Sequence, residues 1–457
     1  MPTIPQQVTL TNSSVDVLNA IRNSATQNYI DHVPIATADA SSIRDIGAII
    51  MDYPALQNEF VSALINRIGR TLITSKLYSN PWAMFKRGFI EFGESIEEIF
   101  VEIASVKDYD LQNGGDVVDK YTQPDVRAAF HVLNYKKYYP DSIAQAELQR
   151  AFLSWDGVNS LIAGIVNSMY TAAAYDEFQT MKYMLARHMI VGQLYPQQIP
   201  VVTEDNMRTV VSNIKSVSNQ LTFMSDNYNL AGVRTFSTHD DQFIIINADF
   251  DATMSVEVLA TSFNMTQAEF MGHRVLIDGF GKLDTDRLNE LFSGQKWYEA
   301  IDNDALQALN TIPAVLVDRN YFMIFDNLDQ FTERYVESNL SWNYFYHVWK
   351  TFSVSPFSNA IMFIPDTPGV ITVEVTPETA TASVGQQVQL TAEVTTTNFA
   401  PQSVTWSVTN TTGTAAATVT SSGLVTITAG AGTNTVTVTA TSTFDSTKTD
   451  TCVITLE

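Results

Sequence analysis

The chain has 457 residues, 49 acidic against 26 basic side chains, and a formal net charge of −23. This length allows two or three domains with cores of their own. The acidic excess excludes a surface built to grip phosphates, which needs a basic face. An acidic protein can still enclose nucleic acid, because repulsion keeps the polyanion mobile.

The single cysteine, Cys452, excludes an intrachain disulfide and is expected to be a small apolar residue on the last strand. The first 30 residues lack a basic stretch followed by an apolar core, so no signal peptide is predicted. No apolar run approaches the ~20 residues that span a bilayer. We expect a soluble protein completed in a reducing cytoplasm.

Residues 1–40 are polar and alternate weakly, with a short helix over Val15–Arg22. They are interpreted as an N-terminal arm without a core of its own. A helix is predicted at Pro54–Ile68, because apolar residues recur there every four positions along one face.

An extended β-hairpin loop is predicted at about 72–121, with turns at Ser79-Asn80-Pro81 and Asn113-Gly114-Gly115. Its middle is acidic and too polar to form a core. The carboxylates are Glu91, Glu94, Glu97, Glu98 and Glu102.

The longest periodic segment predicts a spine helix at about 156–191, with Trp155-Asp156 offering the N-cap. A helix of roughly 33 residues would be on the order of 50 Å long, beyond the diameter of a small globular domain. The alternative is two helices broken near Ala172–Tyr175.

Helices and strands alternate over about 197–335, which is interpreted as an axial domain. Helices are predicted at Val210–Leu221 and Val256–Phe263. The predicted strands are Phe243–Ile246, Val275–Ile277, Val315–Val317 and Tyr321–Phe325.

Two aromatic stretches, Trp342–Trp349 and Asn359–Phe363, are expected to form a strand pair. They suit a core or a subunit interface better than a stacking platform for bases or sugars.

From Pro368 to Glu457 the sequence becomes rich in Thr, Val and Ala, with Lys448 as its one basic residue. Short strands with period 2 are separated by Gly, Asn and Ser turns, a pattern typical of a β-sandwich.

No catalytic, cofactor-binding or metal-binding motif is found, and no cofactor is expected. Six scattered histidines have no metal-ligand spacing. Asp249 and Asp251 flank Phe250 after an apolar strand and could hold a divalent cation for a glycosyltransferase. A solvated junction between strand and turn is the favoured interpretation.

The tail resembles the bacterial Ig-like domain group 2 family in its Val-Thr-Trp-Ser segment at 404–407 and Gly-Leu-Val-Thr segment at 423–426. The remainder resembles the major capsid proteins of small tailed phages of the phi29 type. The matching segments are 18–24, 153–155, 263–265, 275–280 and 342–349.

The resemblance implies an α+β body at 41–367 with the HK97-type capsid fold, followed by an all-β Ig-like sandwich at 368–457. The predicted order of arm, extended loop, spine helix and axial domain agrees with that fold, and consistency between independent predictions favours each of them.

We therefore expect a structural major head protein, not an enzyme, that self-assembles into an icosahedral or prolate shell around double-stranded DNA. The implied partners are copies of itself in pentameric and hexameric capsomers, a scaffolding protein and a portal. The Ig-like domain is expected on the outside, bridging capsomers or contacting head fibres or host-surface glycans. The expected location is the virion, after assembly in the host cytoplasm.

The extended loop is expected to find its packing partners on neighbouring subunits. Its candidate intersubunit contacts are Trp82, Met84, Phe85, Glu94, Glu97 and Glu98, with packing inside the same chain as the open alternative for the three apolar residues. The competing functions are a bacterial surface adhesin carrying an Ig-like module, the metal-dependent glycosyltransferase, and a decoration protein without the shell fold.

Overall fold

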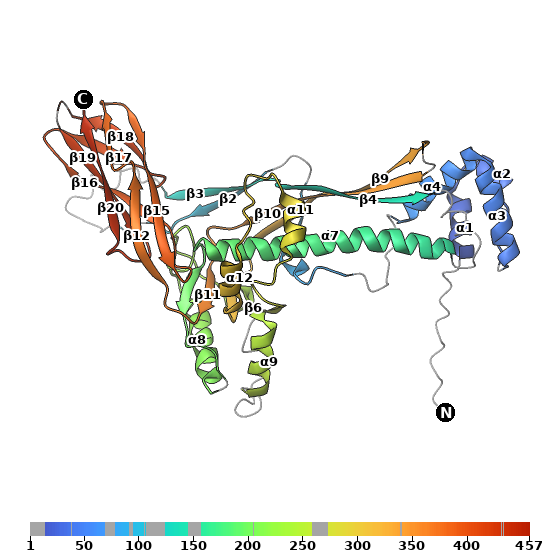
Figure 1. Ribbon diagram of the computed structural model, residues 1–457, viewed down its shortest axis with the longest axis horizontal. Coiled ribbons are helices and arrows are strands. Elements are labelled where there is room, and N and C mark those ends of the chain that lie inside the picture. The colour runs from blue at the N-terminus through green and yellow to red at the C-terminus, as the bar shows by residue number, and fades with distance from the viewer. Residues whose placement is uncertain are drawn as a thin grey trace, which may run out of the picture. The chain divides into compact units, whose positions relative to one another are not determined.

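The computed structural model describes residues 14–37, 39–68, 78–90, 95–104, 106, 124–144, 157–203, 205–257, 273–338, 341–430, 432 and 434–457 (Figure 1). The chain divides into two compact units. Unit 1 comprises Met1–Ser95, His131–Phe178 and Ile324–Phe352. Unit 2 comprises Ile96–Phe130, Gln179–Met323 and Ser353–Glu457.

Unit 1 begins with four helices: α1 (Ser14–Ser24), α2 (Gln27–His32), α3 (Ala40–Asp52) and α4 (Pro54–Ile68). The predicted helix at Pro54–Ile68 is confirmed. The described part of residues 1–40 packs on later residues, because α1 contacts α4 as well as α2. The buried apolar residues of this cluster are Val17, Leu18, Ile21, Tyr29, Ile43, Ile46, Ile50, Leu56 and Phe60.

Side chains of α1 also fix the segment that connects α2 to α3. Arg22 donates from Nε to the Val33 carbonyl at 2.6 Å. Asn19 donates to the Ala36 carbonyl and accepts from the Ala36 amide, at 2.9 and 2.8 Å. These bonds satisfy backbone groups that would otherwise be unpaired at the helix ends.

The sheet of unit 1 has the strand order β1-β9-β10-β4, where β1 is Lys86–Phe89, β9 is Phe322–Val336, β10 is Ser341–Val354 and β4 is Tyr135–Ala144. β1 runs parallel to β9, and β10 runs antiparallel to β4. The prediction that the aromatic stretch Trp342–Trp349 pairs with Asn359–Phe363 is wrong, since the second stretch lies in the sheet of unit 2.

The long helix α7 covers Gly157–Ile190 without a break, which confirms one continuous helix over the broken alternative. No proline interrupts these 34 residues. The predicted N-cap, Trp155-Asp156, lies outside the described residues.

The sheet of unit 2 has the order β5-β11-β8-β6-β7, with β5 at Tyr195–Gln198, β11 at Ala360–Ile364, β8 at Ala314–Asp318, β6 at Gln242–Asn247 and β7 at His273–Ile277. Helices α8 (Met207–Gln220) and α9 (Ala248–Glu257) pack on it through one apolar core. Shorter helices are η2 (His239–Asp241), α11 (Thr285–Phe292) and α12 (Asn303–Asn310). The predicted strands and the helix near 210–221 are confirmed; the predicted helix Val256–Phe263 extends beyond the described residues.

β2 (Ile96–Val101) and β3 (Val126–His131) form a separate two-stranded sheet. The range predicted for the extended loop, about 72–121, contains β2. It also contains the 3-10 helix η1 (Ala83–Phe85) and β1, which belong to unit 1. Residues 107–123 lie outside the described part.

The C-terminal residues form a sandwich, which confirms the all-β prediction. Its pairings are β12-β15, β13-β20-β19-β16 and β14-β18-β17. The core contains only residues of this module, among them Val425, Val436, Val438, Cys452 and Ile454. The strands are β12 (Gly369–Thr376), β13 (Thr379–Ala382), β14 (Gln387–Gln389), β15 (Thr391–Thr397), β16 (Val404–Thr411), β17 (Ala416–Val419), β18 (Leu424–Ala429), β19 (Thr435–Ser442) and β20 (Thr449–Leu456).

Candidate functional site

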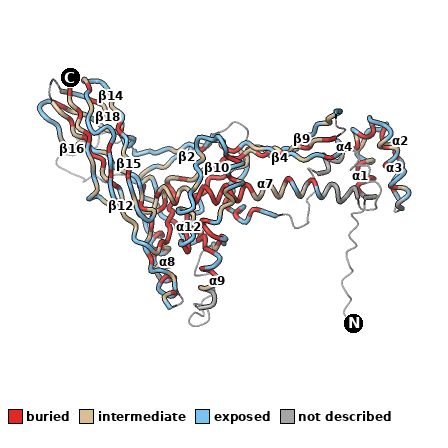
Figure 2. Tube along the Cα trace, viewed as in Figure 1, coloured by how far each residue is buried: buried red, intermediate tan, exposed pale blue. Residues whose placement is uncertain are grey.

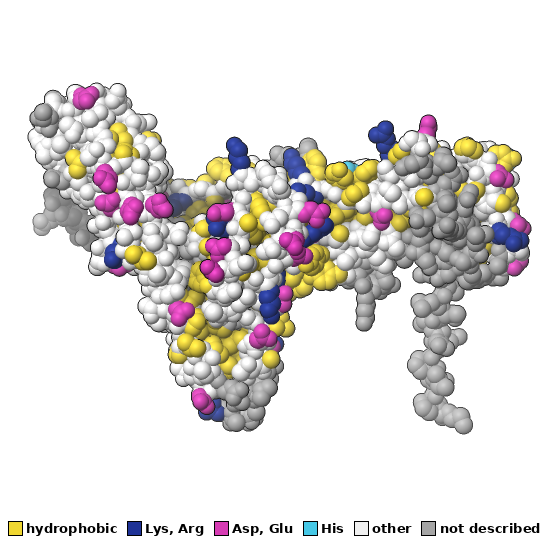
Figure 3. Space-filling view, in the orientation of Figure 1, with side chains coloured by type: hydrophobic (Ala, Val, Ile, Leu, Met, Phe, Trp, Pro, Cys, Tyr) yellow, Lys and Arg dark blue, Asp and Glu magenta, His cyan; other side chains and the backbone are white. Residues whose placement is uncertain are grey.

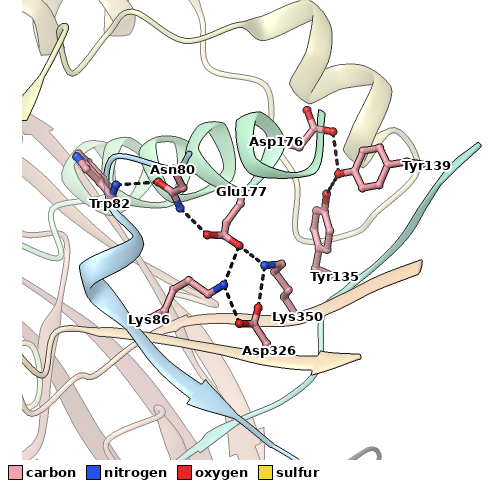
Figure 4. Close-up of polar contacts among 9 residues, drawn as sticks. All are labelled: Asn80, Trp82, Lys86, Tyr135, Tyr139, Asp176, Glu177, Asp326 and Lys350. Atoms are coloured by element: carbon pink, nitrogen blue, oxygen red, sulfur yellow. Dashed lines mark hydrogen bonds and ion pairs between the residues drawn. The ribbon is translucent and has the colours of Figure 1, made fainter. Parts of the chain in front are cut away.

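Four charged side chains meet inside unit 1, where α7 crosses the sheet (Figure 4). We call Lys86, Glu177, Asp326 and Lys350 the ion cluster. Lys86 Nζ lies 3.4 Å from Glu177 Oε2 and 2.7 Å from Asp326 Oδ2. Lys350 donates to Glu177 and lies 2.8 Å from Asp326 Oδ1. Two cations and two carboxylates cancel, so the buried cluster carries no net charge.

A second polar layer holds the Glu177 carboxylate from the other side. Asn80 donates from Nδ2 to Glu177 Oε1 at 2.5 Å, and its own Oδ1 accepts the Trp82 amide at 2.8 Å. The ion cluster thus ties α7 to β1, β9 and β10 and to the segment before η1. The ion cluster holds these elements in one arrangement, because each charged group has more than one partner.

The pKa values of the ion cluster follow from its pairing. Burial acts on Asp326 first and would raise its pKa, but Lys350 and Lys86 outweigh burial and hold that pKa below its ordinary value. Burial would likewise lower the pKa of Lys86, yet Glu177 and Asp326 raise it above the usual value. The folded state therefore favours the ionised form of both groups.

A hydrogen-bond chain from two tyrosines to a carboxylate runs beside the ion cluster. Tyr135 and Tyr139 share a hydrogen bond of 2.7 Å between their hydroxyls, and Tyr139 donates to Asp176 at 2.9 Å. All three are buried. Burial, together with Tyr135 and Asp176, raises the pKa of Tyr139 far above its usual range, so it remains a donor to Asp176.

The inner face of the β2–β3 hairpin packs against other residues of unit 2. Phe100 stacks on Phe357 with ring centroids 5.5 Å apart, and Ser355 Oγ donates to Glu98 at 2.7 Å. From β3, Arg127 donates to the Ala231 carbonyl. These contacts orient the hairpin and decide which of its faces remains outside.

The outer face of the hairpin is apolar. Ile99 and Val101 on β2, and Val126 and Phe130 on β3, are each more than half exposed. Figure 2 shows exposed positions along β2. Side chains two residues apart share one face of a strand, so each pair points the same way. An apolar sheet face of this kind marks a surface that a partner covers.

Of the predicted contact residues, Trp82 and Phe85 are completely buried within their own chain. Trp82 packs edge-on against Phe85 and Phe178, with centroids 5.9 and 5.5 Å apart. The alternative of packing inside the same chain therefore holds for both, since no surface of either is left for a neighbour. Met84 is exposed.

The predicted acidic contacts differ in their surroundings. Glu97 is exposed on the outer face of β2, whereas Glu98 is half-buried on the inner face and accepts from Ser355. Glu94 lies outside the described residues. The alternation in β2 places Ile99 and Val101 outward beside Glu97, whereas Glu98 shares the inner face with Phe100.

The sequence interpretation treated this segment as polar throughout and so missed Ile99, Val101, Val126 and Phe130. The signal was present in the pattern, since Ile99 and Val101 stand two residues apart, as do Ala128 and Phe130. The decisive information is tertiary, because only the contacts of Phe100 and Glu98 show which face is covered.

The carboxylates proposed for metal binding are held by cations instead. Asp251 pairs with Arg274, and Asp249 lies 3.9 Å from Lys282. Both aspartates occupy the first turn of α9, so the expected strand-to-turn junction is in fact the start of a helix. Within the described ranges, no group of three or more His, Cys, Asp or Glu side chains could hold a metal ion.

Over the part of the chain that the structure covers, no helix is both long and apolar enough to cross a membrane. This includes α7, whose residues around Asp176, Glu177 and Lys182 are charged.

The sequence matches two family models. The model of the Phi29-like phage major capsid protein covers residues 18–364, and that of the bacterial Ig-like domain (group 2) covers residues 370–452. Together they account for both parts that the sequence pattern separates near residue 368.

Curated relatives agree with the first model. The chain is 34% identical over 408 residues to the major capsid protein of Bacillus phage PZA, covering 88% of this chain and 85% of that protein. It is 33% identical over 419 residues to the major capsid protein of Bacillus phage B103, covering 90% and 86%. Among solved structures, a chain of the Staphylococcus phage Andhra capsid is 13% identical, with a TM-score of 0.49, covering 65% of this chain and 87% of that one.

Proposed function

Because the chain belongs to the Phi29-like phage major capsid protein family, we propose that its copies build an icosahedral or prolate shell of pentameric and hexameric capsomers around packaged double-stranded DNA. The chain is a structural protein of the virion shell, and its copies associate with one another. Its relatives are named as major capsid proteins, which are not enzymes. An adhesin is not favoured.

The apolar outer face of the β2–β3 hairpin is the observation that carries this proposal. Each copy has a net charge of −23, so copies repel one another wherever their charges meet. Ile99, Val101, Val126 and Phe130 offer an apolar area, next to the single carboxylate of Glu97, on which a neighbouring copy gains hydrophobic burial. Exposed Met84 and Glu97 stay proposed as intersubunit contacts, as does Glu94.

The order of the elements supports an HK97-type division of the body at 41–367. The extended loop is proposed at about 72–121, with α7 as the spine helix at about 156–191 and the axial domain at about 197–335. Residues 1–40, proposed as the N-terminal arm, contribute α1 and α2 to the helical cluster of unit 1.

The acidic charge suits a container for DNA. A basic inner wall would hold the genome by its phosphates, whereas repulsion leaves it mobile during filling. Such a shell also needs a scaffolding protein to guide curvature and a portal through which DNA enters, and we propose both as partners.

We propose that the Ig-like domain at 368–457 faces outward and bridges capsomers. Figure 3 shows few charged side chains on its visible face, most of which is uncharged polar surface or backbone. Lys448 is the one basic residue from Pro368 to Glu457. Modules of neighbouring copies can approach each other through these uncharged areas, although six acidic residues against Lys448 give the module a net negative charge.

Electron microscopy of the purified full-length protein, with and without a scaffolding protein, tests this function. We expect rings or closed shells from the wild type and mostly monomers from an Ile99→Ser, Phe130→Ser double variant. The matched control is Ile371→Ser, which removes an equally exposed apolar side chain from the Ig-like domain. A wild type that is monomeric under every condition would contradict the proposed function. Normal shells from the double variant would contradict only the role of the hairpin.

A further inference from the structure

A compact loop in unit 2, residues 221–237, displays four large apolar side chains to solvent. Phe223 is 72% exposed, Met224 is 59% exposed, Phe236 is 48% exposed and Leu230 is 45% exposed. We call Phe223, Met224 and Phe236 the loop patch. Met224 and Phe236 are neighbours in space, because the loop closes on itself through a bridge between Ser225 and Thr235, and Phe223 precedes Met224 in the chain.

The bridge sets how the patch is arranged. The Ser225 amide donates to the Thr235 carbonyl at 3.0 Å, and the Thr235 amide donates back at 3.1 Å. Met224 precedes one bridge residue and Phe236 follows the other. Since the two segments run antiparallel, these two residues come to lie opposite each other, at a spacing where cross-strand side chains interact.

The loop is rigidly anchored, so the exposure of the patch does not come from a loose segment. Leu221 and Val233 are buried, and the Ser237 amide donates to the Leu221 carbonyl at 2.7 Å. Asn229 donates to the Val233 carbonyl and accepts the Val233 amide, at 2.7 and 2.9 Å. A preorganised surface loses little conformational entropy when a partner covers it.

The loop is also fixed to the hairpin, on the side opposite the apolar outer face. Arg127 on β3 donates to the Ala231 carbonyl, and the Arg234 amide donates to Glu102, which follows β2, at 3.3 Å. All four residues belong to unit 2. The loop and the base of the hairpin therefore move as one body.

We propose that the loop patch is an intersubunit contact covered by a second copy of this chain. The proposal rests on the proposed function, since self-association supplies the partner. Another copy is favoured over an unrelated protein for two reasons. The patch contains no charge, which suits contact between copies that each carry −23. Its loop is also fixed to the hairpin, whose outer face a neighbouring copy is proposed to cover.

The loop patch consists of two phenylalanines and a methionine. Aromatic and methionine side chains are enriched at the centre of protein interfaces. A Phe223→Ser, Met224→Ser double variant of the full-length protein is expected to need about tenfold more protein to assemble, since losing an interface anchor costs on this scale. The unassembled variant should melt at the wild-type temperature, because neither side chain is buried in its own chain.

The identity of the partner is tested by placing a photo-reactive phenylalanine analogue at Phe223. Protein labelled with heavy nitrogen and unlabelled protein are mixed, assembled with scaffolding protein and irradiated. Crosslinked peptides that join a heavy to a light segment of this chain support the proposal. Crosslinks only within one copy, only to the scaffolding protein, or none at all would overturn it.

The outcomes separate this inference from the function on which it rests. A wild type that never assembles removes the proposed function and this contact with it. A loop variant that assembles like the wild type and like Ile371→Ser, while the hairpin variant does not, removes the loop patch alone.

Discussion

Two buried regions of this protein are stabilised in opposite ways. The ion cluster of unit 1 joins α7 to its sheet through Lys86, Glu177, Asp326 and Lys350. The core of the Ig-like domain is apolar, and its strands contribute alternating small aliphatic side chains such as Val436 and Val438. Both regions are mostly buried. The ion cluster depends on each charge having an opposite partner, whereas the core of the Ig-like domain depends on close packing of apolar side chains.

The ion cluster and the apolar core constrain the structure differently. Paired charges are directional, so the ion cluster fixes one position of α7 on β1, β9 and β10 and penalises any shift that separates a pair. Aliphatic contacts are non-directional, so the module's core tolerates substitution as long as volume and alternation are kept.

The largest effect is expected from breaking the charge balance. Lys350→Met leaves Glu177 and Asp326 with Lys86 alone, so one buried negative charge is uncompensated. The free energy of unfolding of unit 1 should fall by about 3 kcal/mol. Urea unfolding of unassembled protein, with hydrogen exchange of α7 amides to assign the transition, measures it.

The control for this charge experiment is Glu290→Gln. Its pair with Arg287 lies on the surface of α11 at 2.9 Å. Removing it should change stability by less than about 0.5 kcal/mol. Equal effects of the two variants would mean that burial does not distinguish these ion pairs.

Removing a buried side chain from the core of the Ig-like domain should lower its free energy of unfolding by about 2–3 kcal/mol. Ile454→Ala leaves a cavity in the core of the Ig-like domain, where Ile454 is fully buried. Protection of β19 and β20 amides from hydrogen exchange should fall while that of the unit 1 sheet is unchanged. Thr451→Ala, an exposed position on the same strand, serves as the control and should alter protection little.

The smallest expected effect concerns how the free energy of unfolding depends on pH in acid. Because the pKa of Asp326 is lowered in the folded protein, its stabilisation is complete above the unfolded value of about 3.9 and is lost as the pH falls through the folded value. Below about pH 4, Asp326→Asn should reduce the loss of stability with falling pH by up to about 1.4 kcal/mol per pH unit.

A neighbouring carboxylate gives the opposite sign. Burial raises the pKa of Asp329, so protonation of Asp329 stabilises the fold as the pH falls through that raised value. Because Asp329 is exposed at the surface, solvent screens this effect, so Asp329→Asn should raise stability at neutral pH only slightly. An unchanged acid limb in Asp326→Asn would show that the ion cluster does not govern acid unfolding.

Regular elements with strong periodicity were predictable from the sequence. The helix at Pro54–Ile68 and the continuous helix near 156–191 follow from apolar repeats and the absence of proline. The strand at Phe243–Ile246 and the sandwich beyond residue 368 follow from β-branched runs and turn residues.

Placement of these elements was harder. The segment Lys86–Phe89 was taken as part of a hairpin, although it pairs in parallel with a strand more than 200 residues later. Trp82 and Phe85 were interpreted as possible contacts with another subunit for the same reason. Local pattern shows that a side chain is apolar but not which distant segment covers it.

By itself the sequence determined the family, the division near residue 368, the long helix and the acidic character of the chain, because these depend on local composition and periodicity. Only the tertiary structure decided that Lys86 and Lys350 meet Glu177 and Asp326, and that Ile99, Val101 and Phe223 remain outside. Burial and charge pairing arise from contacts between segments far apart in the chain, and no local window contains that information.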